Sequence, residues 1–163
     1  MKKLRNSTLL FLVRKKENKI CEICLAMKKR GFGAGRWNGV GGKVEKEKTE
    51  AAAKREAREE ISVSIKKCQK IAELAFFFPH SQDWNQLVHV YLAPEWEGEP
   101  AESEEMNPKW FSIDEIPFDS MWPDDIFWLP EVLKGNLVKG VFEFGPGDII
   151  RKKEVKTVDR LSG

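Results

Sequence analysis

Cysteine, histidine and long apolar runs are all scarce in this chain of 163 residues. The three cysteines, Cys21, Cys24 and Cys68, do not form a disulfide framework and indicate a reducing compartment, for which we expect the cytoplasm. The two histidines, His80 and His89, show no partner pattern, so we read both as structural or surface residues. Any chemistry is therefore expected to rest on other side chains.

No apolar segment is long enough to cross a bilayer, and the net charge is only +2. The apolar run at residues 8–13 is followed by Arg14, Lys15 and Lys16 rather than a cleavage site, so it predicts a first strand instead of a signal peptide. A composition of 41% apolar and 33% charged residues is typical of a soluble globular protein. We expect one domain over residues 1–163, acting as a monomer on a small molecule, with no membrane and no stable nucleic-acid partner.

Cys21 and Cys24 have the CxxC spacing of redox and metal sites. The surrounding apolar pattern indicates a strand, in which this odd separation places the two side chains on opposite faces. A second cysteine pair that would complete a zinc site is absent from the sequence. We therefore interpret both as ordinary strand residues.

The pattern of apolar and turn-forming residues predicts a mixed sheet between helices. A helix is expected to begin near Thr49, a good N-cap residue, and to end near Glu60, with Ala53, Ala57 and Ile61 as its apolar stripe. A second helix is expected at residues 124–134 despite Pro130. Strands are expected at residues 8–13, 20–27, 65–78, 85–92, 109–111, 138–144 and 148–157, with an acidic loop at residues 94–107.

Three carboxylates, Glu56, Glu59 and Glu60, fall on one arc of the first predicted helix. Like charges at this spacing repel each other, and a bound cation would turn that repulsion into attraction. Oxygen ligands suit Mg²⁺, or Mn²⁺, rather than zinc. A solvated charged face explains the same pattern, so helix geometry alone leaves both readings open.

The spacing around these glutamates resembles the Nudix box, Gly-x5-Glu-x7-Arg-Glu-U-x-Glu-Glu-x-Gly-U, where U is apolar. Counting from Gly41 brings Glu47 and the pairs Arg55-Glu56 and Glu59-Glu60 into the fixed positions. The departure is Ser62, which stands where the box has a helix-ending glycine. If this residue adopts a positive φ, serine costs about 1 kcal/mol there without removing a metal ligand.

Segments outside the box carry a more specific resemblance. Residues 27–38, the pair Glu105-Met106, residues 116–118 and residues 121–125 resemble those of the animal-type oxidised-purine nucleoside triphosphatases, which are MutT homologues within the Nudix superfamily. The resemblance covers roughly residues 8–155 and implies an α/β fold, an α/β/α sandwich with a mixed β-sheet and the Nudix loop–helix–loop. It also implies Mg²⁺-dependent hydrolysis of oxidised purine triphosphates, such as 8-oxo-dGTP and 2-hydroxy-dATP, to monophosphate and pyrophosphate.

The resemblance assigns roles residue by residue. It implies metal ligation by Glu56, Glu59, Glu60, Glu105 and the main-chain carbonyl of Gly41, with Arg55 bracing the carboxylates. The general base stays open between Glu59, Glu60 and Glu105, and Glu60 is favoured as ligand and organiser. The residues implied in substrate binding are Thr8, Lys28, Phe32, Asn38, Phe76, Phe78, Met106, Trp122, Asp124, Asp125 and Trp128.

Each assignment has a simpler alternative. Aromatic side chains are more often core than pocket, and Asp124-Asp125 before a helix is typical of an N-cap. In a pocket, however, two such carboxyls resist double ionisation and would offer a purine edge one donor and one acceptor. For function, the alternatives are a Nudix hydrolase of ADP-ribose or dinucleoside polyphosphates, and a nucleotide-binding module without catalysis.

Overall fold

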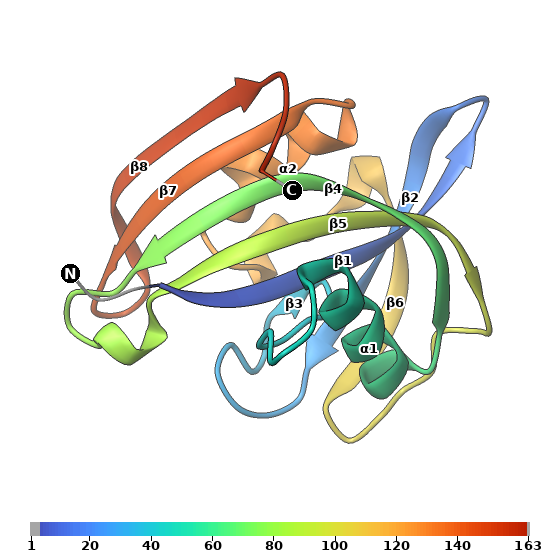
Figure 1. Ribbon diagram of the computed structural model, residues 1–163, viewed down its shortest axis with the longest axis horizontal. Helices are drawn as coiled ribbons and strands as arrows, with labels where there is room; N and C mark the ends of the chain where they lie inside the picture. The colour runs from blue at the N-terminus through green and yellow to red at the C-terminus, as the bar shows by residue number, and fades with distance from the viewer. Residues whose placement is uncertain (1–3, 163) are drawn as a thin grey trace.

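Figure 1 shows the computed structural model, which describes residues 4–162 as a curved sheet with helices on its two faces. The strands are β1 (Arg5–Lys16), β2 (Lys19–Lys28), β3 (Trp37–Asn38), β4 (Ser64–Phe77), β5 (Gln86–Glu97), β6 (Met106–Ser112), β7 (Leu137–Gly145) and β8 (Ile149–Val158). The helices are α1 (Thr49–Ile61) and α2 (Asp125–Leu133), with short 3₁₀ turns η1 (Gln82–Trp84), η2 (Ile113–Glu115) and η3 (Phe118–Ser120).

The sheet is mixed, as the sequence predicts. Its strand order is β3-β2-β1-β5-β4-β7-β8, and β6 pairs with β2. The pairs β1–β5 and β4–β7 are parallel, whereas β1–β2, β4–β5 and β7–β8 are antiparallel. The last of these pairs joins the strands expected at residues 138–144 and 148–157 in a hairpin.

Helix α1 covers one face of the sheet through its predicted apolar stripe. Ala53, Ala57 and Ile61 are buried and share a core cluster with Leu10 and Leu12 of β1. Alanine leaves little volume between helix and sheet, so the helix backbone packs closely on β1. This close packing sets the position of the glutamates on the opposite side of the helix.

Helix α2 covers the other face. Trp128, Leu129 and Val132 pack in a second core cluster with Phe11 of β1 and Phe142 of β7. Alternate residues of β1 therefore point to different helices, as the two-residue period of a strand requires. The result is the expected α/β/α arrangement (Figure 1).

Several predicted boundaries were wrong, most clearly in the loop expected at residues 94–107. Strand β5 continues through Pro94 to Glu97, and β6 already begins at Met106. Proline lacks an N–H, but the pairing of β1 with β5 ends at Ala93, so no sheet bond to β1 is lost. Strand β1 likewise runs beyond residues 8–13, because its charged end pairs with β2 in a hairpin.

The start of α1 also differs in one detail from the prediction. The helix begins at Thr49, but the N-cap position is held by Lys48, without a side-chain cap in the described chain. The Thr49 hydroxyl instead lies 2.5 Å from the Tyr91 hydroxyl of β5. Thr49 thus ties the helix to the sheet rather than capping it.

The cysteines are free thiols in the structure. Cys24 is buried on the α1 side of the sheet, and the Cys21 thiol donates a hydrogen bond to the Arg14 carbonyl at 3.3 Å. Both therefore behave as ordinary strand residues. Among residues 4–162, no helix is long and apolar enough to cross a membrane.

Ser62 ends α1 in the left-handed region, at φ 62° and ψ 31°. Its N–H donates to the Arg58 carbonyl at 3.1 Å, which closes the last turn. The box glycine would adopt this conformation without steric cost, whereas serine adopts it at a cost of about 1 kcal/mol.

We expect Ser62→Gly to raise the free energy of unfolding by about 1 kcal/mol, because glycine relieves the strain at this positive φ. Urea denaturation measures the gain, and turnover should not change. Ser62→Ala is the matched control, since alanine keeps the Cβ and should bring no gain. A loss of stability in Ser62→Gly would contradict this explanation.

Candidate active site

A glycine pair brings the loop before α1 against both β1 and the helix. The N–H of Thr8 donates to the Gly42 carbonyl at 2.9 Å, and a Cβ on Gly41 would lie 1.9 Å from the Thr8 carbonyl oxygen. A Cβ on Gly42 would lie 2.7 Å from the Glu56 carboxylate. Only glycine fits at either position, so the pair makes room for the carboxylate beside the backbone.

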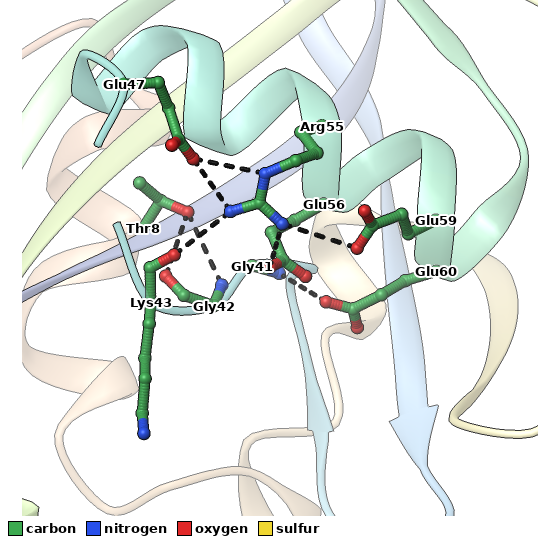
Figure 2. A network of polar contacts seen from close by, with 9 residues as sticks. All are labelled: Thr8, Gly41, Gly42, Lys43, Glu47, Arg55, Glu56, Glu59 and Glu60. Atoms are coloured by element: carbon green, nitrogen blue, oxygen red, sulfur yellow. Dashed lines mark hydrogen bonds and ion pairs between the residues drawn. The ribbon is translucent and has the colours of Figure 1, made fainter. Parts of the chain in front are cut away.

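Arg55 organises the acidic side chains of the site (Figure 2). Its Nη2 and Nε donate to Glu47 at 2.8 and 3.1 Å, and its Nη1 donates to Glu56 at 2.9 Å and to Glu59 at 3.4 Å. Charge-assisted hydrogen bonds of this kind hold side-chain geometry well. The guanidinium is therefore placed to brace the carboxylates that the sequence analysis singles out.

Glu47 contacts Arg55, and the sequence analysis placed Glu47 in the box without assigning it a role. It lies in the loop before α1 and accepts both bonds from one edge of the Arg55 guanidinium. This contact lowers the pKa of Glu47. Its place in the box spacing was the signal that could have identified it as the anchor of Arg55.

Glu60 is the buried carboxylate of the group, with 8% of its surface exposed. Its Oε1 accepts a hydrogen bond from the Gly41 N–H at 3.3 Å, and its Oε2 has no partner within residues 4–162. Burial, together with the neighbouring Glu56 carboxylate, raises the pKa of Glu60 to about 8, while the Gly41 N–H and Lys28 act in the opposite direction. Without a cation, this group favours its protonated form at neutral pH.

These oxygens fit a hard divalent cation. Glu56 and Glu60 are adjacent carboxylates, the peptide group of Gly41 contacts Glu60, and one buried carboxylate oxygen is unpartnered. A donor set made only of oxygen suits Mg²⁺ or Mn²⁺, and the positive charge would offset the cost of ionising Glu60.

The full predicted ligand set is not drawn together in the structure. Glu105, directly before β6, accepts a hydrogen bond from Arg30 Nη2 at 2.9 Å, and Glu59 accepts one from Arg55. Across the described part of the chain, no three Asp, Glu, His or Cys side chains converge on one point. The expectation that Glu105 approaches the α1 carboxylates is therefore not met, because its charge is paired with Arg30.

A pocket of about 280 Å³ opens beside the glycine pair, on the α2 side of the sheet. Gly41 and Gly42 line it, so it adjoins the α1 carboxylates. All the predicted substrate-binding residues line it: Thr8, Lys28, Phe32, Asn38, Phe76, Phe78, Met106, Trp122, Asp124, Asp125 and Trp128.

The structure adds several pocket residues that the sequence analysis missed. Arg5 and Lys43 contribute positive charge, and Gln86 contributes an amide. Lys43 directly follows the glycine pair, and that position was a usable signal. Arg5 and Gln86 reach the pocket only because β1 pairs with β5, where they are register partners.

Two buried carboxyls lie in the pocket. Asp124 and Asp125 are 3% and 2% exposed, and the Trp128 indole N–H donates to Asp124 Oδ2 at 2.8 Å. Within the described residues, Asp125 Oδ2 has no partner, and Asp124 holds the N-cap position of α2 without accepting a capping hydrogen bond from the helix backbone. The simple N-cap reading therefore does not account for this pair.

Burial separates the protonation behaviour of the two carboxyls. It raises the pKa of Asp124 to about 6, against the effect of the Trp128 hydrogen bond. It raises the pKa of Asp125 well above the usual range, and the Asp124 charge adds to this effect. At neutral pH two such carboxyls resist double ionisation, so the pair offers one ionised acceptor and one protonated donor.

These shifts predict how stability depends on pH. Because Glu60, Asp124 and Asp125 bind protons more tightly when folded, their contribution is full below about pH 4, the ordinary carboxyl range, and declines as pH rises. The Glu60 part of the decline extends to about pH 8. Urea denaturation in the presence of a chelator measures the free energy of unfolding of the wild type and of Glu60→Gln. The wild-type value minus the Glu60→Gln value should fall from pH 4 to pH 8. A flat or rising difference would contradict the assignment, and added Mg²⁺ should reverse the decline at pH 8.

Comparisons with known proteins agree with this geometry. The family model described as NUDIX domain matches residues 3–132. An oxidized purine nucleoside triphosphate hydrolase of Danio rerio is 46% identical over 140 residues, covering 85% of this chain and 89% of the relative. The protein of the same name in Mus musculus is 45% identical over 138 residues, covering 84% and 88%. A crystal structure of a MutT protein from Bacillus halodurans superposes with a TM-score of 0.77 at 25% identity, covering 93% of this chain and 97% of that one.

Proposed function

This chain belongs to the NUDIX domain family, and we propose that it is an enzyme that hydrolyses oxidised purine nucleoside triphosphates to the monophosphate and pyrophosphate. The relatives from Danio rerio and Mus musculus carry that activity in their names. The observation that carries the proposal is the contiguity of the pocket with the Nudix glutamates. One glycine pair lines the pocket and also contacts Glu56 and Glu60.

In this proposal the cation is held by oxygens of the box. Glu56, Glu60 and the Gly41 main chain would hold Mg²⁺, or Mn²⁺, with Glu59 and Glu105 completing the set once they leave their arginine partners. When bound, the cation neutralises triphosphate charge and lowers the pKa of a water ligand. Arg55 holds the Glu56 side chain in this orientation, because its Nη1 donates a hydrogen bond to that carboxylate at 2.9 Å.

The chain's own residues then position the triphosphate and the proton. Lys28, which lines the pocket and whose charge acts on Glu60, binds a phosphate oxygen as a point charge. Water attacks the β-phosphorus, and a glutamate accepts its proton. We assign this role to Glu60, because its Oε2 has no partner within the described residues and can accept a proton once a bound cation keeps the carboxylate ionised. Glu59 and Glu105 are the other candidates.

The aspartate pair is proposed to read the purine edge. Asp124 accepts a hydrogen bond from a base N–H, and protonated Asp125 donates one to a base oxygen or nitrogen. Exchange of the proton between them would accommodate more than one oxidised base. Trp122 and Met106 line the same pocket and supply apolar contact area for the ring.

We also propose that the enzyme acts as a monomer in the cytoplasm. The three free thiols fit a reducing compartment, which supports the cytoplasm. Sedimentation of the purified protein tests the first point. A stable dimer at micromolar concentration would overturn it.

A substrate panel with Mg²⁺ tests the proposed function. Oxidised purine triphosphates should yield monophosphate and pyrophosphate. In ¹⁸O-water the label should appear in pyrophosphate, because the attacking water oxygen stays on the β-phosphorus. Label in the monophosphate would instead show attack at the α-phosphorus. Turnover of ADP-ribose or dinucleoside polyphosphates without preference for oxidised purines would favour another Nudix activity. Absence of metal-dependent pyrophosphate release from every nucleotide would favour a binding module.

A further inference from the structure

An arginine covers one face of the pocket tryptophan. The Arg36 guanidinium carbon lies 4.1 Å from the ring centroid of Trp122, and Arg36 Nη1 donates to Asp148 Oδ2 at 2.8 Å. Both charged side chains are 28% exposed, so the ion pair is partly shielded from water. A guanidinium stacked on an indole and held by a carboxylate has little freedom to rotate.

The contact joins parts of the chain that are far apart in sequence. Arg36 ends the loop between β2 and β3, and its carbonyl accepts a hydrogen bond from the Lys28 N–H at 3.2 Å. Asp148 lies in the turn between β7 and β8, at φ 58°. The ion pair therefore connects the loop before β3 with the turn before β8, two strands at opposite ends of the strand order.

The same loop also encloses Trp122 from other directions. The Phe32 ring lies 5.0 Å from the Trp122 ring, and a Cβ on Gly33 would lie 3.2 Å from the indole nitrogen. Phe144 of β7 meets Trp122 edge-on at 5.8 Å. Together with these contacts, the Arg36 stack fixes the plane that the indole presents to the pocket.

The positive charge of Arg36 also acts on Asp124 of the aspartate pair. Burial raises the pKa of Asp124, and the Arg36 guanidinium is among the groups that act in the opposite direction. Arg36 therefore favours the ionised acceptor at Asp124 as well as the orientation of Trp122.

We propose that Arg36 and Asp148 form a positioning pair that holds Trp122 in the plane required by the oxidised base and so sets base selectivity. Neither residue lines the pocket, so the pair acts through Trp122 and Asp124 rather than on the substrate. This inference rests on the proposed function, because it concerns selectivity at the same site.

The chain contains a matched control for this arrangement. The Arg14 guanidinium lies 3.8 Å from the Trp110 ring centroid and pairs with Glu22 at 3.6 Å. It is again an arginine stacked on a tryptophan and paired with a carboxylate, but none of the three residues lines the pocket. Loss of such a stack by itself should therefore leave selectivity unchanged.

The test compares kinetics of Arg36→Ala, Asp148→Asn, Arg36→Lys and Arg14→Ala. For an oxidised purine triphosphate, Arg36→Ala should raise KM about tenfold and change kcat by less than about threefold, because base positioning is lost and the carboxylates are untouched. Asp148→Asn should raise KM by a smaller factor. Arg36→Lys should restore part of the loss, and Arg14→Ala should match the wild type.

An NMR readout needs no substrate. The Trp122 indole N–H signal, assigned by its loss in Trp122→Phe, should shift in Arg36→Ala and stay in place in Arg14→Ala. Unchanged KM in Arg36→Ala, or an equal rise in Arg14→Ala, would overturn the positioning pair. If the wild type shows no preference for oxidised purines, the proposed function is overturned instead. If the Trp122 signal also stays in place in Arg36→Ala, the positioning of the indole by Arg36 is overturned as well.

Discussion

Glu60→Gln is expected to lower kcat by about a thousandfold, the largest effect of any single substitution considered for this chain. Glutamine keeps the shape of the side chain but removes its negative charge and its capacity to accept a proton. The Gly41 N–H that bonds to Glu60 at 3.3 Å still finds an amide oxygen, so the fold should be retained. Steady-state rates with saturating Mg²⁺, together with circular dichroism, measure the two halves of this expectation.

Glu50→Gln is the control for charge loss on the same helix. Glu50 lies in the first turn of α1 and pairs with Lys54 at 3.2 Å on an exposed face. Exposed pairs of this kind contribute little, so its removal should leave kcat near the wild-type value. Near-normal turnover in Glu60→Gln would refute the assignment of Glu60 as ligand and base.

Asp124→Asn is expected to lower the preference for oxidised over ordinary purine triphosphates about a hundredfold. Asparagine can still accept the Trp128 indole hydrogen bond, which Asp124 accepts at 2.8 Å, so packing should be retained. What is lost is the ionised acceptor facing the base. The ratio of kcat/KM values for the two substrates measures the change, and the Mg²⁺ dependence should remain the same.

Asp125→Asn is the matched comparison for this substitution. Asp125 has its pKa raised well above the usual range, so it is already neutral at working pH. An amide replaces a protonated acid with a similar shape and keeps a donor, so the loss should be within about tenfold. Unchanged selectivity in Asp124→Asn would instead favour a purely structural N-cap.

The pH profile gives the same assignment a second test. The pKa of Asp124 is raised to about 6, so selectivity that depends on its ionised form should be present above that pH and decline below it. Asp124→Asn should remove this decline.

Local patterns predicted the helix and sheet framework because they follow from single-chain periodicities. Ala53, Ala57 and Ile61 recur at helical spacing and pack on the sheet as expected. The box spacing likewise placed Arg55 next to Glu56 and Glu59, because all three lie on one helix. The Arg55–Glu59 contact, four residues apart, follows from helix geometry, whereas helix geometry alone does not bring adjacent residues such as Arg55 and Glu56 together.

Contacts between segments that are distant in sequence could not be predicted from local periodicity. Nothing in the local pattern pairs Arg30 with Glu105, or Arg36 with Asp148, because those pairs form only when the sheet brings their loops together. The extent of β5 past Pro94 also depends on where its neighbour β1 stops pairing. These features depend on which strands pair and in which register, and local sequence patterns do not determine that.

Ser62 shows that a departure from a motif can still be read physically. The box glycine indicated a left-handed residue at the end of α1, and the structure has serine there at φ 62°. The conformation is kept because the helix end is fixed by packing of Ile61 and by the Arg58 hydrogen bond.

Initial rates for 8-oxo-dGTP, 2-hydroxy-dATP, dGTP and dATP, measured side by side with Mg²⁺, test most directly whether the enzyme selects oxidised purines. We predict that kcat/KM for at least one oxidised purine exceeds that for its ordinary counterpart by about a hundredfold or more. Equal values for the oxidised and ordinary purines would contradict the central claim that this pocket selects a damaged base.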